Sequence, residues 1–391
     1  MDRVNGKRLI AYTACVFLGM WLMASIHAAM GGLQTSMIDA YSLSDSGKGV
    51  PSGTLTLFSV IAYFAVLLLI GRVHKAVMLL AGAVIAAIGL LPIHFDLPYS
   101  LFLAVLAAVG AGVGITDALA SSSVNDLYTG PAGARVMCAL HATYGLAGFV
   151  MPFLVRAMTG AGVSWRSVFM TLGVGELFAS AAILAVTRGH ARELEGSAEV
   201  RPVAVSDVKS YFGNRRLVGF SVVMFMVGLY LNGVLVWTPR YMELGLESGL
   251  SAFVLPAVYL GLTTSRLLMA FVRVPMMKYM RATQPLGGVC LVVAVLSGSP
   301  VVSLVMIFLG VFAIGPVIPF TLNLAGREDE KKRFMITIVA MLIMMAGQTV
   351  YAPIYGKAES VFGARNALLL TAGVQLLTGV AAALVPGERK K

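Results

Sequence analysis

Apolar stretches of about 20 residues recur along the whole chain of 391 residues, separated by short polar segments. A helix needs about 20 mostly apolar residues to cross a bilayer, and it satisfies its own backbone polar groups there. The sequence therefore predicts an all-α polytopic membrane protein with twelve transmembrane helices. We place them at residues 9–37, 52–71, 75–94, 98–125, 135–159, 166–187, 216–239, 249–272, 279–297, 300–325, 333–357 and 365–385.

The charge content excludes an ordinary soluble domain. Only 12% of the residues are charged, whereas soluble domains carry roughly 25%. The first apolar stretch reaches Gln34 without a small-residue cleavage site, so we interpret it as an uncleaved span rather than a signal peptide. Cys15, Cys138 and Cys290 lie inside apolar stretches and share no metal-like spacing, so we expect neither disulfides nor a metal site.

The net charge of +11 is distributed in short loops. With a cytoplasmic N-terminus, 23 of the 29 Lys and Arg residues fall on the cytoplasmic side of the twelve predicted spans. Such asymmetry is typical of inner, cytoplasm-facing loops, so we expect a multi-pass protein of the cell (inner) membrane with both termini cytoplasmic. No basic stripe with interleaved aromatic residues is present, and nucleic acid is therefore not an expected partner.

The longest polar stretch, residues 188–215, divides the predicted spans into two sets of six. We expect an N-terminal six-helix bundle at 1–187, a cytoplasmic linker at 188–215 in which Ser206 caps a short helix, and a C-terminal six-helix bundle at 216–391. The two halves share interruptions at corresponding positions, which indicates pseudo-symmetric bundles of the kind found in rocking transporters.

Five motifs carry a family resemblance. They are Gly112-Val-Gly-Ile-Thr-Asp117-Ala-Leu-Ala-Ser121; Leu140-His141-Ala-Thr-Tyr144-Gly145-Leu-Ala-Gly148 with Pro152; Trp237-Thr-Pro-Arg-Tyr241; Ser265-Arg266-Leu-Leu; and Gly315-Pro316 with Pro319. Together they resemble the fucose-permease-like sugar–proton symporters of the major facilitator superfamily. The resemblance implies one central site reached alternately from either face, a proton gradient in place of a cofactor, and function as a monomer.

Two of the departures from the family pattern bear on the substrate. Ser121 replaces the asparagine that the family carries four residues after its membrane acid, and Met151 precedes Pro152 where drug antiporters carry glycine. The first departure affects a sugar contact, and the second disfavours drug efflux.

Asp117 is the first candidate for chemistry. An ionised carboxylate at the centre of a bilayer costs about 2.5–3.5 kcal/mol on insertion scales, so it has to face water, find a partner or stay protonated. We interpret it as a proton-coupling or substrate site; the alternative is a neutral acid that holds two helices together. His141 lies at a similar depth in the next span, and imidazole titrates near physiological pH. It is either the proton-coupling partner of Asp117 or a packing histidine bonded to a carbonyl.

A further set of polar residues lies on spans that line the central cavity in the resembled family. Polar groups on aromatic walls suit a hydroxylated solute, although helix packing also explains each residue taken singly. The predicted substrate-binding residues are His27, Gln34, Tyr63, Ser121, Tyr144, Asn232, Tyr259, Gln348 and Tyr351. Glu176 lies on a scaffold span, where we expect an interhelical hydrogen bond.

Charged and proline residues near the cytoplasmic ends are candidates for gating. Asp126 with Arg135, and Arg266 with Glu328 and Asp329, could form ion-pair latches; the alternative is solvated loop charge, since exposed pairs contribute about 0–1 kcal/mol. Pro316 and Pro319 are expected to kink their span.

The predicted function is secondary active transport by alternating access, specifically proton-coupled uptake of a sugar or similar small polar solute. The chain lacks a G-x-x-x-x-G-K-[ST] loop, which disfavours an ATP-driven pump, and we expect no enzymatic activity. The alternatives are an exporter of amphiphilic or drug-like compounds, and a non-transporting receptor or lipid-handling protein. The expected partners are a small-molecule solute and the lipid bilayer.

Overall fold

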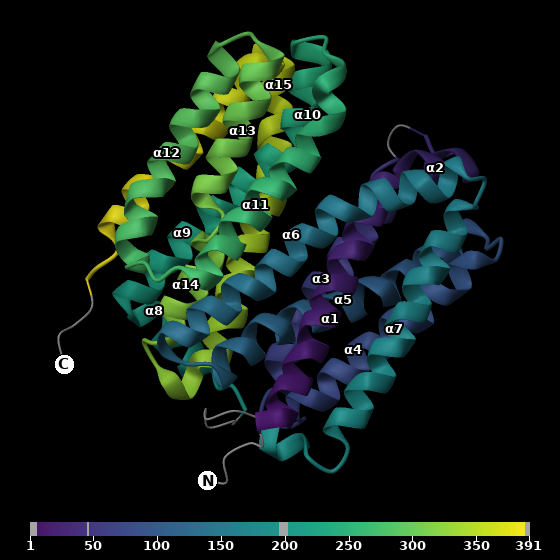
Figure 1. Ribbon diagram of the computed structural model, residues 1–391, viewed down its shortest axis with the longest axis vertical. Coiled ribbons are helices and arrows are strands. Elements are labelled where there is room, and N and C mark those ends of the chain that lie inside the picture. Colours follow the sequence, from purple (N-terminus) through teal and green to yellow (C-terminus); the bar gives the residue numbers. More distant parts are fainter. Residues whose placement is uncertain (1–5, 45–46, 195–201, 388–391) are drawn as a thin grey trace. The chain divides into compact units, whose positions relative to one another are not determined.

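The computed structural model describes residues 6–44, 47–194 and 202–387, and in these ranges the chain is helical without strands (Figure 1). The first part contains α1 (Gly6–Gly32), α2 (Gln34–Ala40), α3 (Val50–Leu69), α4 (Lys75–Leu90) with a 3₁₀ turn η1 (Leu91–His94), α5 (Tyr99–Leu127), α6 (Gly130–Gly160), α7 (Trp165–Thr187) and η2 (Ala191–Leu194). The second part contains α8 (Val205–Gly213), α9 (Arg215–Asn232), η3 (Gly233–Trp237), α10 (Thr238–Arg240), η4 (Tyr241–Gly245), η5 (Gly249–Phe253), α11 (Val254–Phe271), α12 (Met276–Leu296), α13 (Pro300–Ile314), α14 (Val317–Gly326), η6 (Glu330–Lys332) and α15 (Arg333–Leu384).

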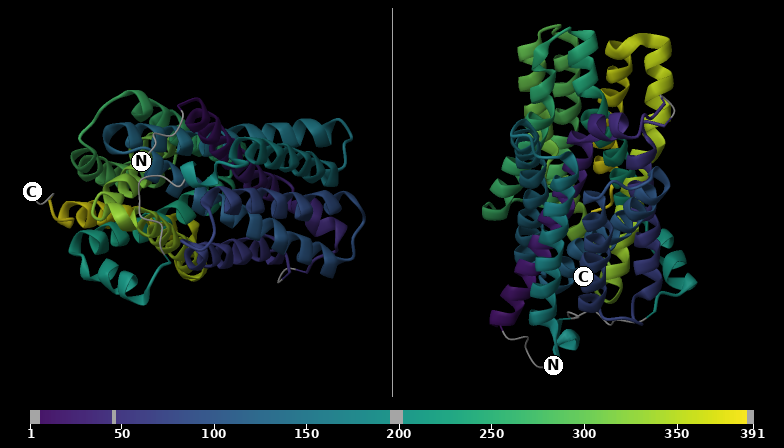
Figure 2. Two further views of the ribbon diagram at one scale, coloured as in Figure 1. Left: turned by 90° about the horizontal axis from the view of Figure 1, so that it is seen from below. Right: turned by 90° about the vertical axis from the view of Figure 1, so that its right-hand side faces the viewer.

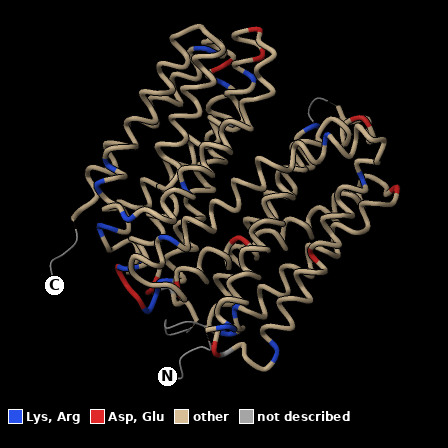
Figure 3. The backbone as a smooth tube through the Cα atoms, in the orientation of Figure 1, with Lys and Arg blue, Asp and Glu red and all other residues tan. Residues whose placement is uncertain are grey.

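Eleven helical segments of the described chain are long and apolar enough to cross a membrane. The last of them, Glu330–Leu384, holds 55 residues, or about 80 Å of helix against a hydrocarbon core of about 30 Å. Gly363 interrupts it with a positive φ of 76°, and Figure 2 shows the chain turning back there. Counting its two arms separately gives the predicted twelve spans, and charged residues gather near the helix ends (Figure 3).

The first predicted span is too long. Helix α1 ends at Gly32, and the chain bends at Leu33 (φ −107°, ψ 8°) into the separate helix α2. Apolar residues continue beyond the bend, and Met37 on α2 is buried like the core residues of α1. The apolar residues alone therefore do not reveal where the first span ends.

The chain divides into two compact units. Unit 1 comprises Met1–Leu127 and Thr143–Val203, and unit 2 comprises Tyr128–Ala142 and Ala204–Lys391. Unit 1 ends at Val203 and unit 2 resumes at Ala204, and this boundary falls inside the predicted linker 188–215. The beginning of α6, by contrast, groups with unit 2, although Ala142, the last residue of that segment, lies 46 residues before the linker begins at residue 188.

The linker contains the expected short helix, α8, but its cap differs from the prediction. The helix begins after Ala204, whose backbone N–H donates to the Asp207 carboxylate at 2.9 Å. A carboxylate in the first turn also complements the helix dipole. Asp207 therefore performs the capping role that we had assigned to Ser206.

The glycines of α5 allow it to pack directly on α3. A Cβ atom on Gly110 would lie 2.3 Å from the Leu55 carbonyl oxygen, and one on Gly114 would lie 2.3 Å from the Ser59 carbonyl oxygen. The close approach also permits Ser59 Oγ to donate to the Gly110 carbonyl at 2.8 Å. Small residues and hydroxyl bonds of this kind hold helices together in lipid, where burial of apolar surface supplies little driving force.

Candidate functional site

Asp117 lies in the interior of α5, within a span, and the residue is half-buried. The buried Tyr63 of α3 is the partner that the structure gives it, and Tyr63 also interacts with Tyr144 of α6. The contact between Tyr63 and Asp117 falls short of full hydrogen-bond geometry. These three residues form the Asp117 cluster of unit 1.

The chemistry of the Asp117 cluster suits a group that changes protonation state. A phenol can donate to a carboxylate, and it can accept from a carboxylic acid, so Tyr63 can serve either form of Asp117. Among the described residues, no Lys, Arg or His forms an ion pair with Asp117. A fixed cation would hold the carboxyl in its charged form, and this acid is not held in that way.

The other predicted unit 1 contacts take different positions. His27 is half-buried, and its Nδ1 lies 3.2 Å from the Met23 carbonyl of its own helix, which leaves Nε2 for another partner. Ser121 is completely buried one turn along α5 from Asp117. Gln34 is exposed on α2, beyond the end of the first span, so our placement of Gln34 within that span was wrong.

Unit 2 contains an irregular segment where the predicted residue Asn232 lies. Two π-helical turns, η3 and η4, flank the three residues of α10. Asn232 directly precedes η3; its Oδ1 is buried without a hydrogen-bond partner in the described structure, as is Nε1 of Trp237. π-Turns occur frequently at functional sites, and both unpartnered atoms are suited to bind a polar solute.

The sequence signal for the π-turns is Pro239, which belongs to the motif Trp237-Thr-Pro-Arg-Tyr241 that we used only for the family resemblance. A proline inside a helix lacks an N–H group, and its ring clashes with the carbonyl four residues earlier. An extra residue in the preceding turn relieves that clash, and η3 ends two residues before Pro239.

Three aromatic residues form a packed wall in unit 2. Tyr355 stacks on Trp237 with ring centroids 4.3 Å apart, and Tyr351 lies 5.9 Å from Tyr355. The Tyr351 hydroxyl hydrogen-bonds with Thr371 Oγ1 at 2.7 Å. Tyr351 and Tyr355 are each 1% exposed, so Tyr351 supports this wall rather than presenting its hydroxyl to solvent.

Two further predicted contacts of unit 2, Tyr259 on α11 and Gln348 on α15, are half-buried. Their role as solute contacts stays a prediction.

Arg266 binds backbone carbonyls where the sequence analysis predicted an acidic latch. Its Nε donates to the Gly315 carbonyl at 2.8 Å, and its Nη1 donates to the His141 carbonyl at 3.1 Å. The Gly315 carbonyl has no helical donor, because the residue four positions later is Pro319. Arg266 therefore satisfies an acceptor that a proline leaves free.

The predicted acidic partners of Arg266 are engaged elsewhere, so that latch was wrong. Glu328 forms an ion pair with Arg216, whereas Asp329 caps η6 and lies 3.8 Å from Lys332. The predicted break in the helix is confirmed: α13 ends at Ile314 and α14 begins at Val317, with Pro316 and Pro319 both buried.

Asp126 also takes a partner that the sequence analysis did not identify. Its carboxylate forms an ion pair with Lys75, the first residue of α4, and the two residues are 2% and 1% exposed. Asp126 belongs to unit 1 and Arg135 to unit 2, so the predicted latch between these two residues stays a prediction. Asp117 belongs to unit 1 and His141 to unit 2, so the pairing of these two residues stays a prediction.

Glu176 of α7 is 1% exposed, and its Oε2 has no hydrogen-bond partner within the described residues. Oε2 of Glu176 therefore does not form the interhelical hydrogen bond that we expected.

Several solved structures share this fold. A major facilitator transporter, FucP, in the outward conformation aligns with a TM-score of 0.74 at 15% identity, covering 97% of this chain and 100% of that one. The human organic anion transporter MFSD10 aligns with a TM-score of 0.75 at 15% identity, covering 96% and 99%. The proton:xylose symporter XylE aligns with a TM-score of 0.72 at 15% identity, covering 98% and 97%.

Sequence comparison identifies the family. No curated protein matches the chain significantly. The family model described as "Major Facilitator Superfamily" matches residues 9–333, which include every described span of unit 1 and most of those of unit 2. The chain therefore belongs to the major facilitator superfamily, and it is a membrane transporter that works by alternating access rather than an enzyme.

Proposed function

We propose that this transporter couples the movement of a small polar solute, such as a sugar, to protons, and that Asp117 is the coupling acid. The observation that carries the proposal is the Asp117 cluster: a half-buried carboxyl group inside a span, with a neutral phenol as its partner. Such a group can exchange a proton with water without breaking an ion pair.

Two structural neighbours are described as proton-coupled sugar transporters, namely the fucose:proton symporter FucP of E. coli and the proton:xylose symporter XylE. The half-buried polar residues that suit a hydroxylated solute are His27 and Tyr144 in unit 1, and Asn232, Tyr259 and Gln348 in unit 2. We further propose a cell (inner) membrane location with cytoplasmic termini, the proton gradient as energy source, and a monomer as the working unit.

The solute has to be identified first. A thermal-shift screen of purified protein against sugars and small organic acids supplies a ligand for transport assays. Organic acids belong in the screen because MFSD10 is described as an organic anion transporter. A screen that finds only amphiphiles would favour export instead and would contradict the proposal.

The coupling test uses proteoliposomes with an imposed proton gradient. A proton crossing about 100 mV releases about 2.3 kcal/mol, which supports up to about 50-fold accumulation of a solute moved with one proton. Asp117→Asn should still exchange labelled for unlabelled solute, but its accumulation ratio should fall to about 1, the value without coupling. External alkalinisation on adding solute should also disappear.

Glu176→Gln provides the matched control, because it neutralises another buried carboxyl group of unit 1 that lies on a different helix. This variant should retain both accumulation and proton movement. Accumulation that survives in Asp117→Asn would show that another group carries the proton.

A further inference from the structure

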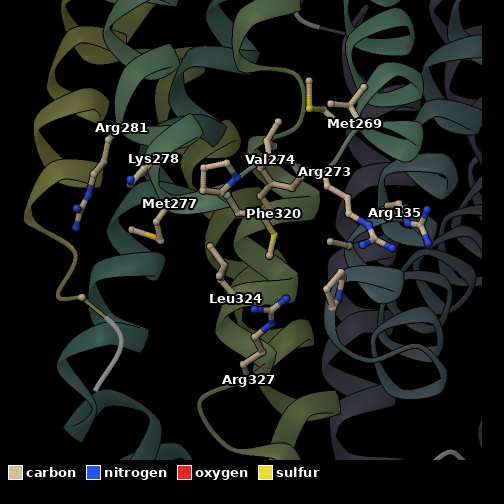
Figure 4. Close-up of a pocket in the computed structure, with 16 residues that line it drawn as sticks. Arg135, Met269, Arg273, Val274, Met277, Lys278, Arg281, Phe320, Leu324 and Arg327 are labelled. Atoms are coloured by element: carbon tan, nitrogen blue, oxygen red, sulfur yellow. The ribbon is translucent and has the colours of Figure 1, made fainter. Parts of the chain in front are cut away.

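A pocket at one end of unit 2 collects basic side chains. It has a volume of about 680 Å³ and is lined from the beginning of α6, the end of α11, the beginning of α12 and the end of α14. Its basic lining residues are Arg135, Arg273, Lys278, Arg281 and Arg327, and Asp and Glu are absent from its lining within the described chain. Figure 4 shows Lys278 and Arg281 on one side, and Arg135 and Arg273 on the other.

Nearby acidic residues are already neutralised by other cations. The loop after Arg327 carries three consecutive acids, Glu328, Asp329 and Glu330. They form ion pairs with Arg216, Lys332 and Arg333, none of which lines the pocket. Among the described residues, the acids of that loop therefore do not neutralise Arg135, Arg273 or Lys278 of the pocket.

The basic side chains differ in what they bind. Arg281 donates to the Val385 carbonyl at 2.8 Å, where it caps the end of α15. Arg273 and Lys278 are exposed, whereas Nε of Arg135 is buried and has no hydrogen-bond partner in the described part of the chain. A buried donor without an acceptor costs free energy, and an anion in the pocket would supply the acceptor.

The rest of the lining is apolar. Met269, Met277, Phe320 and Leu324 contribute to it, and Phe320 and Leu324 lie between the two basic sides in Figure 4. A small soluble anion would gain nothing from these side chains. An amphiphile with an anionic head would use both kinds of lining, because its chains would cover the methionine and phenylalanine surfaces.

We propose that this pocket binds the headgroup of an anionic phospholipid from the leaflet next to it. Its headgroup lies among Arg135, Arg273 and Lys278, and its acyl chains run along Met277 and Phe320. The charge pattern of the loops assigns this end of unit 2 to the cytoplasmic side, where anionic lipids attract basic pockets between transmembrane helices. The proposal is independent of the transported solute and of Asp117.

The test is a lipid titration of the detergent-purified full chain followed by native mass spectrometry, with phosphatidylglycerol, phosphatidylcholine and inorganic phosphate as separate probes. Wild type should retain phosphatidylglycerol preferentially. Each basic residue near an anionic headgroup contributes about fivefold to affinity, so Arg273→Gln with Lys278→Gln should bind phosphatidylglycerol roughly 25-fold more weakly. Met277→Glu, which places a negative charge in the pocket, should also lose the lipid.

The matched control is Arg72→Gln with Arg215→Gln, which removes the same charge from two exposed positions outside the pocket. It should bind phosphatidylglycerol as wild type does. Equal weakening in the control would reduce the effect to general charge attraction and overturn the proposal. Equal retention of phosphatidylcholine, or occupancy of the same pocket by inorganic phosphate with equal affinity, would overturn it as well.

Discussion

The buried ion pair between Lys75 and Asp126 allows a quantitative prediction for the stability of unit 1. Lys75 begins α4 and Asp126 lies near the end of α5, and the pair joins the two helices at their adjoining ends. Lys75→Met retains most of the side-chain volume and removes the charge. Asp126 would then be left as a buried charge without its cation.

The magnitude follows from the burial of the pair. The side chains of Lys75 and Asp126 are 2% and 0% exposed. Removing one partner of a buried pair costs about 3–5 kcal/mol, whereas replacing both with apolar residues is often neutral. We therefore expect Lys75→Met to lower the free energy of unfolding by about 3–5 kcal/mol, and Lys75→Met with Asp126→Leu to recover most of that loss.

The assay is equilibrium unfolding in mixed micelles with increasing sodium dodecyl sulfate, followed by the fluorescence of the three tryptophans. Asp96→Asn is the control, because Asp96 forms its ion pair with Arg166 while its side chain is 90% exposed; the loss should be at most about 1 kcal/mol. A loss for Lys75→Met no larger than that of Asp96→Asn would refute the reasoning. So would a double variant that is no more stable than the single one.

Four other substitutions test the packing of unit 2. Gly347→Ala should destabilise the protein by about 1–3 kcal/mol, because its Cβ would lie 2.1 Å from the Phe225 carbonyl oxygen; Gly373→Ala, which meets nothing within 4 Å, should leave stability unchanged or raise it in the same unfolding assay. Arg266→Lys should reduce solute exchange in proteoliposomes at normal expression, since a single ammonium group cannot reproduce the spread of two guanidinium donors. Tyr351→Phe should cost about 1–3 kcal/mol by leaving Thr371 without its partner, and should leave the apparent affinity for solute unchanged.

The spans were predictable because length and apolarity are local properties of the sequence. The same holds for the break at Pro316, since proline disrupts a helix wherever the helix packs. The bend after Gly32 was missed although Gly31, Gly32 and the polar run Gln34-Thr35-Ser36 mark it locally. The π-turns near Pro239 were missed although a local signal existed.

The choice of partners was not predictable in the same way. Asp126 lies nine residues before Arg135 in sequence, but its carboxylate binds Lys75, 51 residues away. Sequence proximity suggested Arg135 as a partner, whereas the pair with Lys75 depends on the packing of α4 against α5. Asp117 was identified from the cost of its charge in lipid, which is a property of one residue; its partner Tyr63 on α3 depends on how α3 and α5 pack.

Pro319 of α14 links a local property of the sequence to the choice of a partner on another helix. Pro319 removes the donor that the Gly315 carbonyl would have in a regular helix, and this consequence can be read from the sequence. An acceptor of that kind inside a membrane needs a donor from another helix, because water and lipid cannot replace it there. Arg266 is the cation of α11 within reach, and a charge buried in a span is itself tolerated only when it is bound. The proline and the arginine therefore each satisfy the requirement that the other creates, so substituting either one should weaken the same contact between α11 and the helix break.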